Sequence, residues 1–443
     1  MKNFLTLIVF IFSTTLISQN LDFGGEITFL SVGSNKEEIP FWMYTNTNTA
    51  LGQTTNFSGI GDLKTKYSFE SSFIEAGVAV FYRDGMIDDF QRRDLYLRYQ
   101  NSWLSTTIGA KQQEIEVEGL SATNKNILWS SNARPLPGLI IEANNPIKIS
   151  ETFSIDWGIA HYSLNDERYV DDVWLHYKRL GLITTFNDHN KLTAKIQHFA
   201  QWAGTSPTFG KLPNDLSAFI EVFFAKQTST EGENANVLGN HLGSIMLDYE
   251  FVTNIGDFSV YYDHPFEDRS GLRFANFPDG VWGVFYTPEN KKIISNFLYE
   301  YIDTSDQSGN TSISGFDNYF SNNLYRSGWT YEGNIIGLPF IMTDKDIVIN
   351  DITSPIVSNR VRLHHIGVSG SFNKIEWMLK TTFSKNLGTY NKPFNPTLEN
   401  WYNYVSFSYT TNLYGTFILI GGVDISNLND TIVGGGLSYS YSF

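Results

Sequence analysis

The chain ends with the sequence GGGLSYSYSF, residues 434–443, which shows the alternation that recurs along the chain in its clearest form. In it, Leu437, Tyr439, Tyr441 and Phe443 alternate with small residues. Because successive side chains on a β-strand point to opposite faces, the pattern predicts a strand with one apolar face and one small polar face. Such a strand fits either the end of a secreted sandwich or the last strand of a membrane barrel, and the rest of the chain distinguishes the two.

The same alternation with a period of two recurs upstream. Clear examples are the segments 155–159, 192–197, 245–251, 297–301 and 375–383, and turn-rich tracts such as 187–190 and 254–257 separate segments of this kind. The positions opposite the apolar ones are often ionisable, as at Glu70, Asp156, Lys195, Asp248, Glu250, Glu300 and Lys380. We therefore expect many antiparallel strands, each with one apolar and one polar face.

Two architectures share this pattern. A soluble sandwich buries the apolar faces between two sheets, whereas a transmembrane barrel turns them towards lipid and keeps polar side chains in its lumen. The ionisable positions suit a wet lumen better than a dry core, and the many aromatic residues suit the headgroup regions of a membrane. The terminal Phe443 also resembles the closing aromatic of bacterial outer-membrane barrels, which implies the barrel assembly machinery as a partner. We predict an all-β, transmembrane antiparallel barrel.

The composition of the 443-residue chain excludes several other classes. Charged residues make up only 17% and aromatics 15%, while the mean hydropathy is −0.20, as expected when one face of each strand meets lipid and the other meets water. The formal net charge of −15 argues against nucleic acid as a partner, because phosphate binding needs a basic surface. The chain has no cysteine, which excludes disulfides, thiol catalysis, cysteine-ligated zinc, iron–sulfur clusters and a lipid anchor on cysteine.

Residues 1–18 are predicted to be a secretory signal peptide. Lys2 gives a positive start, an apolar run follows from Phe4 to Phe12, and Ser18 belongs to a small polar exit. The apolar run is shorter than the ~20 residues of a spanning helix, which disfavours an uncleaved anchor. Export together with the barrel pattern predicts the cell outer membrane, with outer-membrane lipids around the barrel.

The length predicts the size of the barrel. At roughly 24 residues for a strand and its loop, we expect about 18 strands, with 16 as the alternative. The barrel is expected to span residues 61–443, because alternation lapses between Ser34 and Ile60. Residues 19–60 would then form a small N-terminal periplasmic segment, a cap or a plug. A second lapse between His264 and Trp282 predicts a further irregular segment.

Several short motifs resemble one family when they are taken in order. They lie at residues 130–137, 240–243, 266–273, 279–280, 328–333, 359–360 and 386–390. Together they resemble the Wzi-type capsule assembly proteins, in a Bacteroidetes-like branch. The resemblance implies an outer-membrane barrel with a helical periplasmic cap, which acts as a lectin that binds exported capsular polysaccharide and holds it at the cell surface. The stretch from Ser34 to Ile60 departs from this pattern, since it lacks the apolar heptad of a helical cap.

A polysaccharide site needs aromatic faces for the sugar rings and polar groups for their hydroxyls. The irregular segments 128–138 and 262–273 concentrate such residues, and arginines would offset the charge of an acidic polysaccharide. The candidates for binding polysaccharide or lining the lumen are Arg134, Trp202, Asp263, His264, Glu267, Asp268, Arg269, Arg273, Trp282 and Trp329. Each has a structural alternative, because arginine–carboxylate pairs brace large lumens and tryptophans anchor barrels at the membrane interface.

We predict no enzyme, no cofactor and no metal site. The chain has no Gly-x-Ser-x-Gly elbow, the acidic run 166–172 lacks the spacing of a calcium loop, and the adjacent His364 and His365 should point to opposite faces of a strand. The favoured hypothesis is therefore a non-catalytic polysaccharide-binding barrel. The alternative is an outer-membrane porin or sugar channel. A barrel hydrolase is a third hypothesis, in which His264 would be essential.

Overall fold

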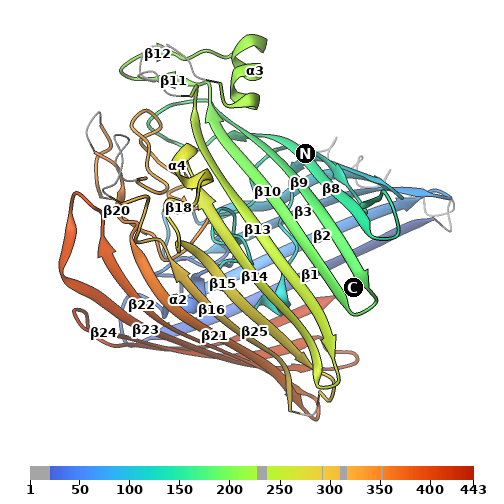
Figure 1. Cartoon of the computed structure of the whole chain (residues 1–443). Coiled ribbons are helices and arrows are strands. Elements are labelled where there is room, and N and C mark those ends of the chain that lie inside the picture. The colour runs from blue at the N-terminus through green and yellow to red at the C-terminus, as the bar shows by residue number, and fades with distance from the viewer. Residues whose placement is uncertain (1–19, 227–236, 292, 310–316, 345, 351–352) are drawn as a thin grey trace, which may run out of the picture.

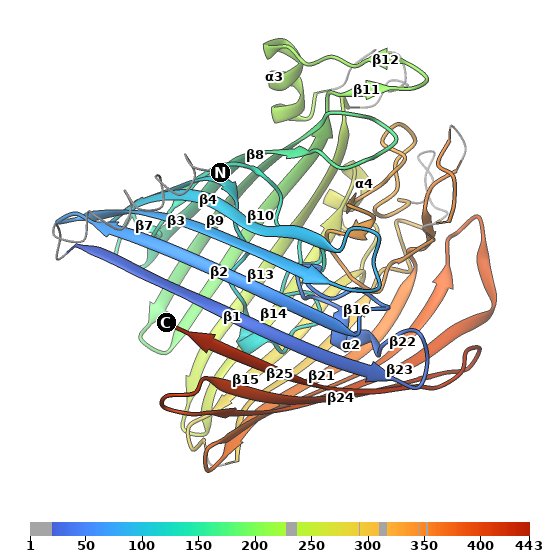
Figure 2. The same cartoon turned by 180° about the vertical axis from the view of Figure 1, so that it is seen from behind.

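A computed structural model of the chain describes residues 20–226, 237–291, 293–309, 317–344, 346–350 and 353–443. Within these residues, 18 antiparallel strands form one closed barrel (Figure 1). The barrel closes because β1 (Leu21–Ser34) pairs with β25 (Ile432–Ser442), and Figure 2 shows the two strands side by side. The predicted all-β barrel of about 18 strands is confirmed, whereas the predicted signal peptide lies outside the described residues.

The remaining barrel strands follow one another around the wall, each antiparallel to the next. They are β2 (Phe57–Ser68), β3 (Ser72–Arg83), β4 (Phe90–Asn101), β5 (Leu104–Ala110), β6 (Gly138–Ala143), β8 (Phe153–Leu164), β9 (Val173–Asn187), β10 (Asn190–Trp202), β13 (Asn240–Thr253), β14 (Gly256–Phe266), β15 (Gly280–Pro288), β16 (Ile294–Asp303), β21 (Val361–Phe372), β22 (Ile375–Gly388), β23 (Pro393–Thr410) and β24 (Thr416–Ser426).

Short elements occupy the connections. They are β7 (Ile147–Lys148), β11 (Thr205–Ser206), β12 (Gly210–Lys211), β17 (Thr330–Tyr331), β18 (Asn334–Ile335), β19 (Met342–Thr343), β20 (Ile356–Ser358), the helices α2 (Phe41–Tyr44), α3 (Leu216–Phe224) and α4 (Arg269–Leu272), and a 3-10 turn at Val117–Gly119. None of the helices in the described part of the chain is long and apolar enough to cross a membrane.

The two faces of the wall follow the predicted alternation. On β13, Leu247 and Tyr249 point outward and are exposed, whereas Ser244 and Asp248 point into the lumen and are buried. On β21, His365 is buried in the lumen while His364 lies outside and contacts the Tyr299 hydroxyl, so the two histidines occupy opposite faces as predicted. The outward face is therefore the apolar one, as a barrel in lipid requires.

Most of the ionisable residues predicted to face the lumen do so. These are Asp156, Lys195, Asp248, Glu250, Glu300 and Lys380. The prediction for Glu70 was wrong, because this residue lies in the turn between β2 and β3, where the Phe69 N–H donates to the Ser72 carbonyl. The apolar residues on both sides of the turn had concealed it.

The two ends of the barrel differ in their connections. The β2–β3, β9–β10 and β13–β14 connections are short, and Phe443 pairs with Gly25 at the same end, which we call the turn end. The opposite end carries the long connections, and we call it the loop end. Because bacterial outer-membrane barrels have short periplasmic turns and long outer loops, the turn end corresponds to the periplasmic side.

Three connections from the loop end fold back into the lumen. We call them together the plug, and they comprise residues 35–56, 111–137 and the described parts of 304–360. Phe41 of α2 stacks on Tyr402 of the wall with 4.4 Å between ring centroids. Trp329 of the plug meets Phe199 of the wall at 5.2 Å, so wall and plug share one apolar core inside the barrel.

The barrel starts earlier in the chain than predicted. We expected residues 19–60 to precede it, but Leu21–Ser34 forms β1 and pairs with β2 on one side and β25 on the other. Phe23 and Phe29 of this strand face outward, although two glycines interrupt the alternation that would reveal it. The segment 35–56 then enters the lumen with only the single helical turn α2, so it is part of the plug and does not build a helical cap.

Candidate functional site

The lumen wall carries polar side chains where the plug touches it. On β16, the buried Glu300 accepts hydrogen bonds from Ser121 Oγ at 2.6 Å and from the Ala122 N–H at 2.8 Å. The Tyr261 hydroxyl on β14 donates to the same carboxylate at 2.6 Å. Since a buried carboxylate is costly unless it is hydrogen-bonded, these contacts hold residues 121–122 of the plug against the wall.

Two further wall residues hold the neighbouring part of the plug. Asp263 Oδ2 accepts the Ile127 N–H at 2.9 Å, and His365 Nε2 lies 2.7 Å from the Leu120 carbonyl oxygen. Gly367 lets the two surfaces approach, because a Cβ at this position would lie 2.8 Å from the Leu120 Cβ. Wall and plug are therefore complementary in both shape and hydrogen bonding.

The plug segments also bind one another. Trp329 is fully buried and donates its Nε1–H to the Leu128 carbonyl at 2.6 Å. Arg134 forms an ion pair with Glu332 and donates to the Arg92 carbonyl at 3.0 Å, and burial lowers the pKa of Arg134. We call this packed region around Leu128 and Trp329 the dry half of the lumen.

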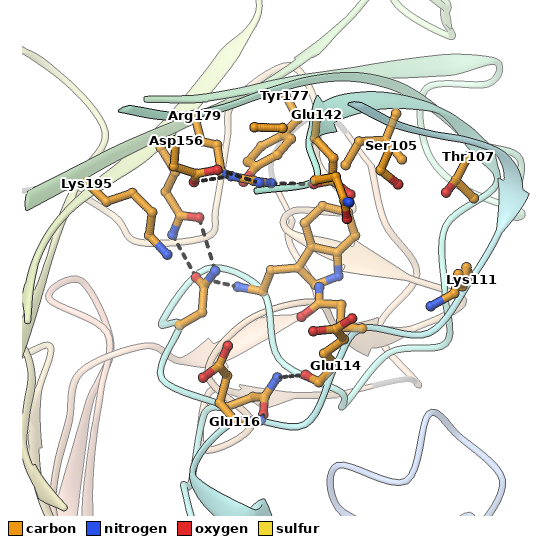
Figure 3. A pocket seen from close by; sticks show the side chains of 18 of the residues that line it. Ser105, Thr107, Lys111, Glu114, Glu116, Glu142, Asp156, Tyr177, Arg179 and Lys195 are labelled. Carbon is orange, nitrogen blue, oxygen red and sulfur yellow. Dashed lines mark hydrogen bonds and ion pairs between the residues drawn. The ribbon is translucent and has the colours of Figure 1, made fainter. Parts of the chain in front are cut away.

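Between the plug and the wall of β4–β6, β8–β10 and β13 lies a cavity of about 560 Å³ (Figure 3). It extends to the turn end, because Gln100 and Asn144, which adjoin turns, belong to its lining. In Figure 3 the strand residues Arg179 and Lys195 enter it from one side, and Glu116 of the plug lies on the other. A hollow of this size is typical of small-molecule sites, and we call it the wet half of the lumen.

Charged side chains of both signs line the cavity. Arg179 holds two carboxylates, with Nη1 2.6 Å from Glu142 Oε2 and Nε 2.8 Å from Asp156 Oδ2. Lys125 of the plug pairs with Asp248 of the wall at 2.6 Å. Acidic and basic lining residues are equal in number: Glu114, Glu116, Glu142, Asp156 and Asp248 against Arg98, Lys111, Lys125, Arg179 and Lys195. The cavity therefore offers many polar contacts without a strong field of one sign.

Trp129, Tyr162 and Tyr177 line the cavity, and of these three Trp129 is the one that is partly exposed. Trp129 of the plug meets Tyr162, Tyr177 and Phe199 edge-on, with centroid separations of 5.1, 5.9 and 5.4 Å, and stays partly exposed. Asn126 fixes its backbone by accepting the Trp129 N–H at 3.1 Å. An aromatic side chain surrounded by amide, hydroxyl and charged groups is the combination that a saccharide requires.

A second buried polar cluster lies at the loop end, outside the cavity. Asp279 accepts hydrogen bonds from the Asp306 N–H at 3.0 Å, the Gln307 N–H at 2.8 Å and the Tyr319 hydroxyl at 3.0 Å. Burial nevertheless raises the pKa of Asp279 to about 7 and that of Glu267 to about 8. Among the described residues, no group of three or more His, Cys, Asp or Glu is arranged to hold a metal ion.

None of the sequence-predicted candidates lines the cavity. Arg134, Asp263 and Trp329 lie in the lumen, where they join wall and plug as described above. Trp202 and Trp282 lie on the outward face of the wall, and Trp282 stacks on Tyr262 with 3.8 Å between centroids.

The other candidates lie at the loop end near α4. His264 is buried on the outward face, Glu267 accepts the Phe320 N–H at 2.8 Å, and Asp268 caps α4 by accepting the Ser270 N–H at 2.6 Å. Arg269 is the first residue of α4, and Arg273 is exposed just after it. Contact between any of these residues and a polysaccharide stays a prediction.

The cavity gathers residues that sequence reasoning did not select as a site. Asp156, Lys195 and Asp248 were recognised as facing the lumen, and the same alternation could have found Arg179, two residues after the inward Tyr177. Trp129 carries no such signal, because it belongs to an irregular segment whose position depends on the folded plug.

The comparisons with known proteins agree with this architecture. A family profile described as capsule assembly protein Wzi matches residues 34–346. Among solved structures, OccK5 (OpdH) from Pseudomonas aeruginosa has a TM-score of 0.51 at 10% identity, covering 96% of this chain and 97% of that one. OccK3 (OpdO) from the same species reaches 0.52 at 9% identity with 96% and 95% covered, and a BenF-like porin from Pseudomonas fluorescens Pf-5 reaches 0.50 at 9% with 96% and 98% covered.

At these identities the likeness to solved structures shows the fold alone. No curated protein matches the sequence.

Proposed function

The chain belongs to the Wzi family of capsule assembly proteins, and we propose that it binds surface or capsular polysaccharide and helps to assemble or retain it at the cell surface without catalysis. It is an outer-membrane protein with a porin-like barrel. The family supports the role in capsule assembly, and the non-catalytic part of the proposal rests on that assembly role and on the likeness of the barrel to porins.

The observation that carries the saccharide proposal is the cavity with Trp129 in its surface. Its lining supplies amide, hydroxyl and paired charged groups around one partly exposed aromatic side chain, as polysaccharide binding requires. The cavity extends to the turn end, so we infer that it would hold a saccharide segment that approaches from the periplasmic side.

The predicted candidates at the loop end offer a second surface. Arg273 is exposed on the side that corresponds to the cell exterior, where a retained polymer would lie. The cavity at Trp129 and the loop-end surface at Arg273 are therefore two alternative binding sites for the polysaccharide, and one experiment distinguishes them.

Capsule retention in a strain that lacks the gene provides this test. We expect the deletion strain to shed polysaccharide into the medium and the native chain to restore retention. Trp129→Ala should restore it only in part, with several-fold more polysaccharide shed, because the aromatic contact is lost. Calorimetry with purified capsular polysaccharide should show a parallel loss of affinity for this variant.

The matched control is Trp401→Ala, which removes an exposed tryptophan from the outward face of β23 and should retain the capsule normally. If Arg273→Ala sheds polysaccharide and Trp129→Ala does not, the binding surface lies at the loop end. Normal retention in the deletion strain itself would contradict the proposed function.

The second candidate function is a porin or sugar channel, which the porin-like fold favours. The packed plug favours the polysaccharide-binding barrel, because its side chains fill the lumen around Trp329 and Leu128. Planar bilayer recordings separate the two functions. We expect the native protein to show no large steady openings, and such openings would favour the channel.

We also propose two partners at the periphery. Outer-membrane lipids would surround the apolar outward face. The barrel assembly machinery would recognise Phe443, whose backbone exchanges two hydrogen bonds of 3.0 Å with Gly25 while the residue stays 55% exposed.

A further inference from the structure

One region of the outward face is polar, in contrast to the rest of the wall. Near the loop end of β8, β9, β10 and β13 it carries His161, His176, Lys178, His198 and His241. The strand registers place these residues next to one another: His161 is opposite His176, and Lys178 is opposite His198. They point outward because Tyr177 and Phe199, which alternate with them, belong to the core of the lumen. Direct contact of these histidine and lysine side chains with lipid acyl chains would be unfavourable in free energy.

Helix α3 covers this polar region from outside. Phe219 lies 6.1 Å from His161 and 5.3 Å from His176 between ring centroids. The Lys178 ammonium lies 4.3 Å from the centre of the Phe223 ring and donates a hydrogen bond to the Phe223 carbonyl oxygen. The side chains of one face of α3 thus shield the polar groups and supply an acceptor for the lysine.

The uncovered polar groups near α3 bind one another. His198 Nε2 lies 2.9 Å from His241 Nδ1, and His241 Nε2 lies 2.8 Å from the Leu238 carbonyl oxygen. These contacts satisfy both ring nitrogens of His241, whereas His176 Nε2 and His198 Nδ1 are buried without a hydrogen-bond partner among the described residues.

The opposite face of α3 is apolar and exposed. Leu216, Ile220 and Phe224 are 74%, 41% and 65% exposed, and their spacing of four residues aligns them in one stripe along the helix. Only Ser217 and Glu221 of this helix are polar. A helix that is apolar on both faces next to a membrane protein's wall is suited to lipid rather than to water.

The position of α3 along the wall agrees with this. Figure 1 shows the helix at the loop end, next to β10. Trp174 and Trp202 lie in the adjacent row of the wall, 5.1 Å apart, and tryptophans mark the boundary between acyl chains and headgroups. On the other side of Lys178, Leu180 and Leu182 are exposed outward on β9, so the apolar stripe of α3 continues the apolar face of the barrel.

The neighbouring strands β14 and β15 repeat the arrangement. His264 is buried on the outward face, its ring stacks on Phe274 at 4.2 Å, and its Nε2 lies 3.0 Å from the Gly271 carbonyl oxygen. Leu272 and Phe277 of the covering connection are exposed. Two separate connections therefore place apolar side chains outside a buried histidine at the same end of the barrel.

We propose that α3 lies in the outer leaflet of the outer membrane as an interfacial helix, with its Leu216–Ile220–Phe224 stripe in contact with lipid acyl chains. The helix restores an apolar surface over the polar patch and anchors the loop end at the membrane boundary. This is independent of polysaccharide binding, because no residue of α3 or of the patch lines the cavity.

Single cysteines carrying a nitroxide label test the proposal, and the absence of native cysteine makes the labelling specific. Ile220→Cys lies on the stripe, Ser217→Cys lies on the polar side of the same helix, and Leu180→Cys on the wall is the lipid benchmark. In vesicles of dioleoylphosphatidylcholine, the ratio of collisions with molecular oxygen to collisions with a water-soluble nickel chelate should be several-fold higher for Ile220→Cys than for Ser217→Cys. It should approach the ratio for Leu180→Cys. Gel migration before and after heating verifies that each variant is folded.

Two results would overturn the proposal. If the label at Ile220→Cys reports the same nickel accessibility as the label at Ser217→Cys, the stripe faces water. If unlabelled Ile220→Cys forms intermolecular disulfides in the vesicles on oxidation, or the labelled variant shows spin–spin broadening, the stripe is covered by a second copy of the chain instead of by lipid.

Discussion

The dry and wet halves of the lumen belong to one barrel, but their wall carboxylates have different surroundings. Glu300, in the dry half, is buried and bound by the hydroxyls of Ser121 and Tyr261 and by a backbone N–H. Asp248, in the wet half, pairs with Lys125 at the edge of a cavity. Both are inward acids on neighbouring parts of the wall, so the strand position alone does not set their role. What differs is whether the plug packs against the wall or leaves space beside it.

The position of the plug decides where the lumen is packed and where a cavity remains beside the wall. Plug groups donate to both carboxylates, but Glu300 is enclosed by packed side chains, whereas Asp248 also borders the cavity.

Trp329→Ala should have the largest effect, because it removes a fully buried side chain and its hydrogen bond to Leu128 from the dry half. Truncation of a buried aromatic costs about 3–5 kcal/mol of stability. We expect a lower thermal midpoint and, because the plug loosens, the appearance of conducting events in planar bilayers.

Trp129→Ala is the matched control in the wet half. Trp129 is partly exposed to the cavity, so its truncation should lower the thermal midpoint less than Trp329→Ala does. It should also produce no conducting events in planar bilayers. Equal losses in the two variants would mean that the two halves are not packed differently.

A smaller effect is expected for the pH dependence of the contact between Asp279 and the plug residues Asp306 and Gln307. Burial raises the pKa of Asp279 to about 7, above the value of about 3.9 for an ordinary aspartate, so the folded state holds its proton more tightly than the unfolded state. The contribution of Asp279 to the free energy of unfolding is therefore greatest at low pH and falls as the pH rises from about 4 to about 7. We expect the amides of Asp306 and Gln307, which donate to Asp279, to exchange hydrogen faster at pH 8 than at pH 5 after correction for intrinsic rates.

Asp279→Asn should flatten this pH dependence, because the amide cannot ionise. Part of the dependence should remain, since burial also raises the pKa of Glu267 to about 8 and that of Asp317 to about 6. Greater protection of the two amides at pH 8 than at pH 5 in the native chain would reverse the predicted sign.

Sequence reasoning recovered the barrel and much of its wall. Alternation identified the inward Asp156, Lys195 and Asp248, and separated His364 from His365, because facing is a local property of an extended chain. It failed where the alternation was interrupted or misleading. Two glycines interrupt the alternation in β1, so this strand was not predicted. Glu70 was assigned to a strand because apolar residues flank the turn in which it lies.

The candidate site was much less predictable. The candidates were taken from two irregular segments and from three tryptophans, and Arg134, Asp263 and Trp329 among them lie in the lumen, where they join plug and wall. Trp129, which lies at the cavity, stands in one of the same segments, but no local pattern distinguishes it from the others.

Local properties of the chain were sufficient for the closed barrel, its approximate number of strands and the inward or outward direction of most side chains. These properties follow from the alternation of apolar and polar residues and from the length of the chain, both of which can be read from the sequence alone. The division of the lumen into a packed half and a cavity depended on contacts between distant segments, such as that of Leu120 with His365, 245 residues apart. Contacts of this kind arise only when connections from one end of the barrel fold back inside it, and the same folding outside the wall places α3 over its histidines.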